Sequence, residues 1–198
     1  MNCQKMIFPL AVLFDMDGTL TVPTFDFPAV RMAMGLPEGA PILEEMAKMP
    51  PAQRAEVEGI LRRFEDEVAD KAPLADGCEE LIAYLRQRGV AIAVITRNRR
   101  ESVARFLQRY PLPIDVWISR EDTPHKPHPY PLELACRRLG VLPGDAWMVG
   151  DGQFDVEAAI NAGAKGVWLS LGRQRPFAAQ PWRTVGDLLE LMALLQGL

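Results

Sequence analysis

The chain has 198 residues, of which 48% are hydrophobic, and this supports one well-packed core with room for a small inserted domain. Its formal net charge of -4 argues against a dedicated nucleic-acid-binding protein, which normally carries a basic excess. No apolar run reaches the ~20 residues that a membrane span requires, and the acidic balance is too mild to predict disorder.

The first predicted element is a buried strand over residues 10–14, which ends at Asp15. The apolar run that contains it also resembles a short signal peptide, but it stops at acidic residues and not at a small-residue cleavage site. Three widely spaced cysteines, Cys3, Cys78 and Cys136, lack a metal-binding spacing and predict reduced thiols in a cytoplasmic protein.

Residues 22–72 contain no segment with the character of a strand. Apolar residues at helical spacing between 57 and 68 predict one long amphipathic helix, and two prolines separate it from a shorter helix near 41–48. We therefore expect residues 22–72 to form a small helical domain. It would be inserted in a larger domain made of residues 1–21 and 73–198.

From residue 76 onward, predicted helices alternate with short apolar strands. The expected strands cover 90–95, 114–118, 146–149 and 166–169, and the expected helices cover 76–88, 98–110, 131–139, 154–162 and 185–195. Asp76 is expected to cap the first of these helices, with Glu79 three residues later. Asn98 is expected to cap the second, with Glu101 three residues later. The alternation predicts an α/β fold with a doubly wound parallel sheet.

Polar residues stand where the predicted strands stop, and the carboxyl ends of parallel strands line the ligand crevice of an open sheet. These residues are Asp15-Met16-Asp17-Gly18-Thr19, Thr96, Lys126, and Asp151 with Asp155. Carboxylates gathered at one place repel each other unless a cation neutralises them, and Mg²⁺ suits a small site with oxygen ligands that also binds phosphate. Lysine and threonine donate to phosphoryl oxygens, and a carboxylate can act as a nucleophile while a second one moves protons.

These motifs, together with Gly150-Asp151-Gly152-Gln153-Phe154-Asp155, resemble the four motifs of the haloacid dehalogenase superfamily of phosphohydrolases. They follow the family's order, and the resemblance spans roughly residues 11–170. The insertion at 22–72 is similar to the helical cap of phosphoglycolate-phosphatase-like and β-phosphoglucomutase-like members. The resemblance implies that this cap opens and closes about hinges near residues 20–23 and 72–74.

The resemblance implies a role for each acidic residue. Asp15 would be the nucleophile that forms an aspartyl-phosphate, and it would also be a magnesium ligand. Asp17 would be the general acid and base, and its backbone carbonyl would face the metal. Asp151 would complete the metal site, whereas Asp155 would support it or orient Lys126. Asp17 also argues against a dehalogenase, whose substrate has no leaving-group oxygen to protonate.

The resemblance also implies which residues bind phosphate. Thr96 would bind the transferring phosphoryl group, and Lys126 would hold that group and the nucleophile in place. Backbone amides around Gly18 and Thr19 would supply further donors. Asn98, the expected cap of the next helix, is grouped with Gly18, Thr19 and Arg97 as a candidate substrate- or phosphate-binding residue.

Three arginines follow Thr96 at the predicted start of a helix, where the helix dipole disfavours cations. Residues that go against such a local preference beside a candidate site can indicate a functional role. We therefore hypothesise that Arg97, or its neighbours Arg99 and Arg100, binds an acidic part of the substrate. The alternative is a solvated helix face, which is the interpretation for the other arginines between 86 and 109.

The sequence thus predicts a cytoplasmic, Mg²⁺-dependent phosphatase that acts on a small phosphorylated metabolite. It would be a monomer or a small homo-oligomer, with no nucleic-acid or membrane partner. The nearest alternative is a phosphomutase of the β-phosphoglucomutase type, and a catalytically silent regulatory or binding protein of the same fold is another. A two-component receiver domain is disfavoured because no aspartate directly follows the predicted third strand, 114–118.

Overall fold

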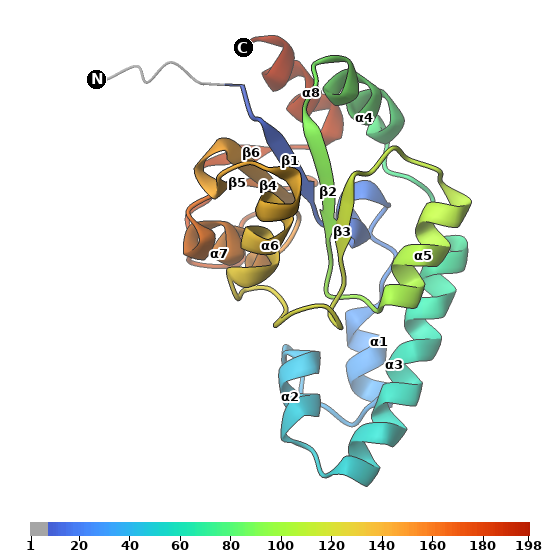
Figure 1. The fold of residues 1–198 in the computed structure, drawn as a ribbon. Coiled ribbons are helices and arrows are strands. Elements are labelled where there is room, and N and C mark those ends of the chain that lie inside the picture. Colours follow the sequence, from blue (N-terminus) through green and yellow to red (C-terminus); the bar gives the residue numbers. More distant parts are fainter. Residues whose placement is uncertain (1–7) are drawn as a thin grey trace. The chain divides into compact units, whose positions relative to one another are not determined.

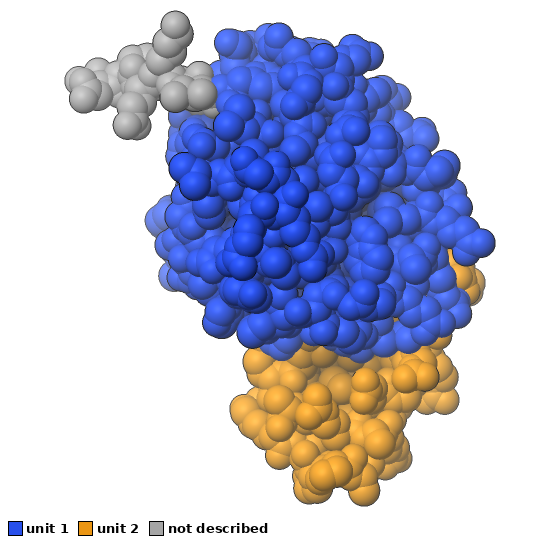
Figure 2. Space-filling model, viewed as in Figure 1, with its two compact units in different colours: residues 1–23, 73–198 blue, residues 24–72 orange. Residues whose placement is uncertain are grey.

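The computed structural model describes residues 8–198, so the predictions made for Cys3 and for the first residues of the N-terminal apolar run lie outside the described chain. The described residues form two compact units, shown in separate colours in Figure 2. Unit 1 contains the chain up to Pro23 together with Pro73–Leu198, and unit 2 contains Thr24–Ala72.

Unit 1 is built on a parallel sheet of six strands, which Figure 1 shows at its centre. The strands are β1 (Ala11–Phe14), β2 (Ala91–Ile95), β3 (Val116–Ile118), β4 (Ala146–Gly150), β5 (Lys165–Leu169) and β6 (Arg183–Val185). Their order is β3-β2-β1-β4-β5-β6, and every neighbouring pair is parallel. This confirms the predicted doubly wound α/β fold. The edge strand β6 was not predicted, because its sequence Arg183-Thr184-Val185 is short and has one buried residue.

Helices pack on both faces of this sheet. They are α4 (Cys78–Gln87), α5 (Arg100–Arg109), α6 (Tyr130–Leu139), α7 (Gln153–Ala162) and α8 (Leu188–Gln196). Side chains alternate along β1, so that Val12 and Phe14 join the core under α4, α5 and α8, whereas Ala11 and Leu13 join the core under α6 and α7. A single 3₁₀ turn, η2 (Pro143–Asp145), precedes β4.

Three predicted helix starts are wrong in their details. The helix expected over 185–195 begins only at Leu188, after the cap Asp187, and Val185 belongs to β6. Helix α4 begins after Gly77, which adopts a left-handed conformation, and no side chain caps the helix. Helix α5 begins after Arg99, and its first amide, that of Arg100, donates to the Glu121 carboxylate at 2.7 Å. The cap of α5 thus comes from a residue 21 positions away, and this leaves the Asn98 side chain available for another partner.

Unit 2 consists of three helices, α1 (Phe27–Ala33), α2 (Ile42–Lys48) and α3 (Pro51–Lys71). They enclose a core of their own, formed by Val30, Met34, Ile42, Met46, Val57 and Leu61. Helix α1 was not predicted: it is only seven residues long and contains one buried residue, so it lacks a periodic apolar stripe.

The two chain segments that connect unit 1 to unit 2 pair with each other within unit 1. Thr21 and Leu74 form an isolated antiparallel bridge. The amide of Val22 donates to the carbonyl of Pro73, and the amide of Ala75 donates to the carbonyl of Leu20. In residues 8–198, no helix combines the length and the apolarity needed to cross a membrane.

Candidate active site

The candidate site lies at the carboxyl end of the central strands. Strand β1 runs between β2 and β4, so the residues that follow these three strands are neighbours. The amide of Asp15 continues the ladder by donating to the carbonyl of Val149 at 2.9 Å. After Asp15 the chain forms a short wide helical turn, η1 (Met16–Leu20), which is interrupted at Asp17 and Gly18.

Gly18 is required where it stands. Its φ of 74° is unfavourable for residues with a side chain, and a Cβ atom there would lie 2.8 Å from the Asp151 Oδ2 atom. The loop after β1 and the loop after β4 therefore approach each other closely because residue 18 has no side chain. This brings Asp151 to the same place as Asp15.

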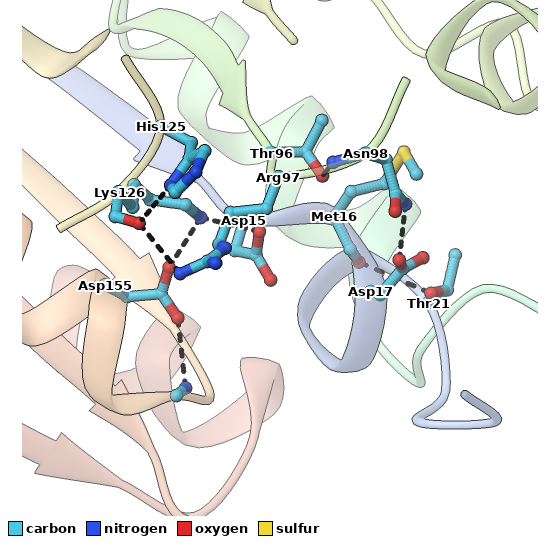
Figure 3. Close-up of polar contacts among 11 residues, drawn as sticks. Asp15, Met16, Asp17, Thr21, Thr96, Arg97, Asn98, His125, Lys126 and Asp155 are labelled. Atoms are coloured by element: carbon cyan, nitrogen blue, oxygen red, sulfur yellow. Dashed lines mark hydrogen bonds and ion pairs between the residues drawn. The ribbon is translucent and has the colours of Figure 1, made fainter. Parts of the chain in front are cut away.

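Lys126 is the cation at the centre of the site. It is 2% exposed, and its Nζ donates to Asp15 Oδ1 at 2.7 Å and to Asp155 Oδ1 at 2.6 Å (Figure 3). The other oxygen of Asp155 accepts a hydrogen bond from the Gly152 amide at 3.0 Å. Both oxygens of Asp155 thus accept hydrogen bonds, one from Lys126 and one from the Gly152 amide, and these contacts are consistent with its predicted role in orienting Lys126.

The burial of this cluster changes its acid–base properties. Burial raises the pKa of Asp15 from 3.8 to about 7; Asp155 and Asp151 add to this increase, and Lys126 opposes it. Burial and the charge of Asp155 raise the pKa of Asp151 to about 6, against the effect of Arg173. For Lys126, burial acts to lower the pKa, but Asp15 and Asp155 outweigh it and raise the pKa. The three carboxylates of Asp15, Asp151 and Asp155 thus carry more negative charge than Lys126 and Arg173 neutralise.

The acidic group fits a divalent cation. One carboxylate oxygen from each of Asp15, Asp151 and Asp155 lies within 4.8 Å of the others. Both oxygens of Asp155 already accept hydrogen bonds, so Asp15 and Asp151 are the side chains best placed to bind a metal. Hard oxygen ligands of this kind suit Mg²⁺, which commonly uses only one or two carboxylates. The Asp17 carboxylate is outside this group, which leaves its backbone carbonyl as the atom expected to face the metal.

Asp17, Thr96 and Asn98 form a second set of contacts at the site. The Asn98 side-chain amide donates a short hydrogen bond to Asp17 Oδ2, and the Asn98 backbone amide donates to Thr96 Oγ1 at 3.0 Å (Figure 3). Thr19, two residues after Asp17, is buried, and its hydroxyl has no hydrogen-bond partner within residues 8–198. Asn98 therefore links the loop after β2 to the loop after β1.

Arg97 contacts the loops that carry the other site residues. Its Nη1 donates to the carbonyl of Lys126 at 2.9 Å, and its guanidinium lies over the Phe154 ring, 4.0 Å from the ring centre. Arg99 is buried and pairs with Glu101, and Arg100 pairs with Asp122. The Arg97 guanidinium therefore binds two other loops of the protein, and its role in substrate binding stays a prediction.

Two residues of the site were missed by the sequence analysis. Arg173 forms an ion pair with Asp151, with 2.9 Å between Nη2 and Oδ2, and Phe154 supplies the ring on which Arg97 lies. Arg173 comes from a loop without regular structure, so no local pattern indicates its role. Phe154 lies within the fourth motif, but an apolar residue in the first turn of a helix usually packs in the core and does not indicate a site.

The chain matches a family model described as haloacid dehalogenase-like hydrolase over residues 29–169. The chain belongs to this family. The matched residues include Thr96, Lys126 and Asp151 but begin after the Asp15 loop. A phosphoglycolate phosphatase from Xylella fastidiosa is 33% identical over 183 residues, which cover 79% of this chain and 78% of that protein.

Solved structures show the same fold. A hydrolase from Pseudomonas syringae has a TM-score of 0.80 at 20% identity, and the match covers 96% of this chain and 99% of the hydrolase chain. A candidate β-phosphoglucomutase from Thermotoga maritima has a TM-score of 0.70 at 22% identity, and the match covers 95% of this chain and 99% of that one. The predictions of a haloacid dehalogenase-like fold and of an enzyme of this hydrolase family are confirmed.

Proposed function

We propose that this protein is a Mg²⁺-dependent phosphatase that hydrolyses a small phosphate monoester through an aspartyl-phosphate on Asp15. The observation that carries the proposal is the buried Lys126, which binds Asp15 and Asp155 while Asp151 lies beside them. The relative named phosphoglycolate phosphatase supports the reaction class. The predicted cytoplasmic location and the small phosphorylated partner are part of the same proposal, as is the assignment of residues 22–72 as a cap.

In the first proposed step, an Asp15 carboxylate oxygen attacks the phosphorus atom and the bond to the leaving-group oxygen breaks. Lys126 keeps one Asp15 oxygen in place by its hydrogen bond, so that the other oxygen is the attacking atom. The metal, held by Asp15, Asp151 and the Asp17 carbonyl, would withdraw charge from the phosphoryl oxygens. The Thr96 hydroxyl and the amides of the Asp15 loop would bind the remaining phosphoryl oxygens.

Asp17 is proposed to move the protons. It would donate one to the leaving-group oxygen as that oxygen departs, and in the second step it would accept one from the water that attacks the aspartyl-phosphate. The hydrogen bond from the Asn98 side-chain amide to Oδ2 orients the Asp17 carboxylate for this transfer. The products are the dephosphorylated alcohol and inorganic phosphate, and Asp15 is regenerated.

A phosphomutase of the β-phosphoglucomutase type is the second candidate, and the fold shared with the Thermotoga maritima structure is consistent with it. The two reactions share the first step and differ in whether water or a sugar hydroxyl receives the phosphoryl group. A catalytically silent protein would need neither the buried Lys126 nor the acidic group around it, and this disfavours that alternative.

The test is phosphate release from a generic aryl phosphate by the full chain, with Mg²⁺ and with EDTA. We expect release with Mg²⁺ and none with EDTA. A screen of phosphorylated metabolites follows, and product analysis with a sugar monophosphate separates the mutase from the phosphatase. Absence of phosphate release from both the aryl phosphate and the screen would contradict the proposed phosphatase.

Removing the metal is expected to make stability strongly pH-dependent. The folded-state pKa of Asp15, about 7, lies above its ordinary 3.8, so its contribution to stability is fully present below pH 4 and is lost as the pH rises through 7. In EDTA, the melting temperature should fall by roughly 5 °C more in wild type than in Asp15→Asn between pH 5 and pH 8. Melting curves with EDTA and with Mg²⁺ test this, and equal slopes in the two proteins would contradict it.

Arg97→Ala is expected to lower kcat about tenfold. The Arg97 guanidinium donates to the backbone carbonyl of Lys126, and Lys126 in turn binds Asp15, so the loss of Arg97 should disturb the position of Lys126. Steady-state kinetics on an aryl phosphate measure the effect, with Arg105→Ala, an arginine on the exposed side of α5, as the control. A rise in KM with unchanged kcat would instead support the predicted role of Arg97 in binding an acidic part of the substrate.

A further inference from the structure

The loop that follows β5 makes an unusual turn beside the site. Leu171 has a φ of 50° and Gly172 has a φ of 75°, and within residues 8–198 Leu171 is the only residue other than glycine with a positive φ. A left-handed conformation is unfavourable for leucine and persists only where surrounding contacts impose it. Here the amides of Ser170 and Leu171 donate to the carbonyls of Val185 and Gly186, which holds the turn against β6.

This turn directs Arg173 toward Asp151. The Arg173 amide and its Nε both donate to the carbonyl of Ser170, at 2.8 and 3.2 Å, so the base of the side chain is fixed. Its Nη2 then donates to two atoms of Asp151, the carboxylate Oδ2 at 2.9 Å and the backbone carbonyl at 3.1 Å. One guanidinium nitrogen thus binds both the main chain and the side chain of the same residue.

These contacts leave Asp151 little freedom. Its carbonyl also accepts a hydrogen bond from the Trp168 indole at 3.0 Å, and Gly18 lies directly against its carboxylate. Of the two carboxylate oxygens, Oδ2 is bound by Arg173, which leaves Oδ1 free to bind a metal. Arg173 is also the one cation that forms an ion pair with Asp151 among the described residues, whereas Lys126 pairs with Asp15 and Asp155.

We propose that Arg173 is a positioning residue that fixes the Asp151 carboxylate so that its Oδ1 faces the magnesium site. This inference rests on the proposed function, because it assumes that Asp151 is a metal ligand. Groups that hydrogen-bond to a metal ligand commonly change metal affinity by about 10–100-fold when they are removed. Arg173 does not contact the reacting atoms, so its removal should act through metal binding.

The first test measures Mg²⁺ binding without substrate, by the rise in melting temperature of the full chain during a MgCl₂ titration. Arg173→Gln is expected to raise the half-saturating Mg²⁺ concentration about tenfold or more. Arg173→Lys should fall between wild type and Arg173→Gln, because an ammonium group can pair with the carboxylate but lacks the guanidinium geometry. Arg175→Gln is the matched control: Arg175 lies in the same loop, bonds Gln180, and should titrate as wild type.

Kinetics on an aryl phosphate give the second reading. The Mg²⁺ concentration for half-maximal rate should rise in Arg173→Gln by the same factor as in the melting titration, and saturating Mg²⁺ should recover most of kcat. If Arg173→Gln reached half-saturation at the same Mg²⁺ concentration as wild type, or at a lower one, the positioning role would be overturned and the phosphatase proposal would stand. A wild-type protein that neither responds to Mg²⁺ nor releases phosphate would instead overturn the proposed function, and this inference with it.

Discussion

Asp15→Asn is expected to reduce phosphate release by at least about 10³-fold, because an amide cannot form the proposed aspartyl-phosphate. Phosphate release from an aryl phosphate at saturating Mg²⁺ measures the loss. The fold should be retained, since the substitution preserves the shape of the side chain. In EDTA at pH 8 the variant should melt higher than wild type, because it removes a carboxylate whose ionised form is disfavoured by burial.

Asp145→Asn is the matched control for this substitution. Asp145 is an exposed aspartate at the start of β4, at the opposite end of the strand from the site. It should retain wild-type activity and wild-type pH dependence. Substantial turnover by Asp15→Asn would reject Asp15 as the nucleophile and, with it, the covalent mechanism.

Asp17→Asn is expected to lower kcat by about 10²–10⁴-fold on an alkyl phosphate, because the leaving alkoxide then departs without a proton. With nitrophenyl phosphate the result should differ. Nitrophenolate needs no proton to leave, so the first step should proceed, whereas attack by water on the aspartyl-phosphate lacks its base. We therefore expect a burst of roughly one nitrophenolate per enzyme, followed by slow turnover.

Rapid mixing with nitrophenyl phosphate measures the burst, and acid quenching detects the phosphorylated protein. Asn98→Ala is an informative companion, because it removes the amide that fixes the Asp17 carboxylate while keeping the carboxylate itself. Its kcat should fall by roughly tenfold, less than in Asp17→Asn. Near-normal steady-state turnover of both substrates by Asp17→Asn would overturn the proton-transfer role.

Much of this protein could be predicted from its sequence. Uninterrupted apolar runs such as Val90–Ile95 mark buried parallel strands, and their alternation with amphipathic helices determines the doubly wound sheet. The position of the polar residues at strand ends then places Asp15, Thr96 and Asp151 at one edge of that sheet. These features depend on local patterns and on the geometry of parallel sheets, so they can be inferred without coordinates.

Other features of the site depend on contacts between distant residues. Asp155 fixes Lys126 across 29 positions, and Arg173 reaches Asp151 across 22. Asn98 looked like a helix cap, but its side chain bonds Asp17, because Glu121 binds the first amide of α5. The sequence by itself determined the fold, the family and the edge of the sheet where the chemistry lies. Only the tertiary structure decided which polar groups bind each other there, because buried charges choose partners by distance and desolvation, and neither is encoded in local spacing.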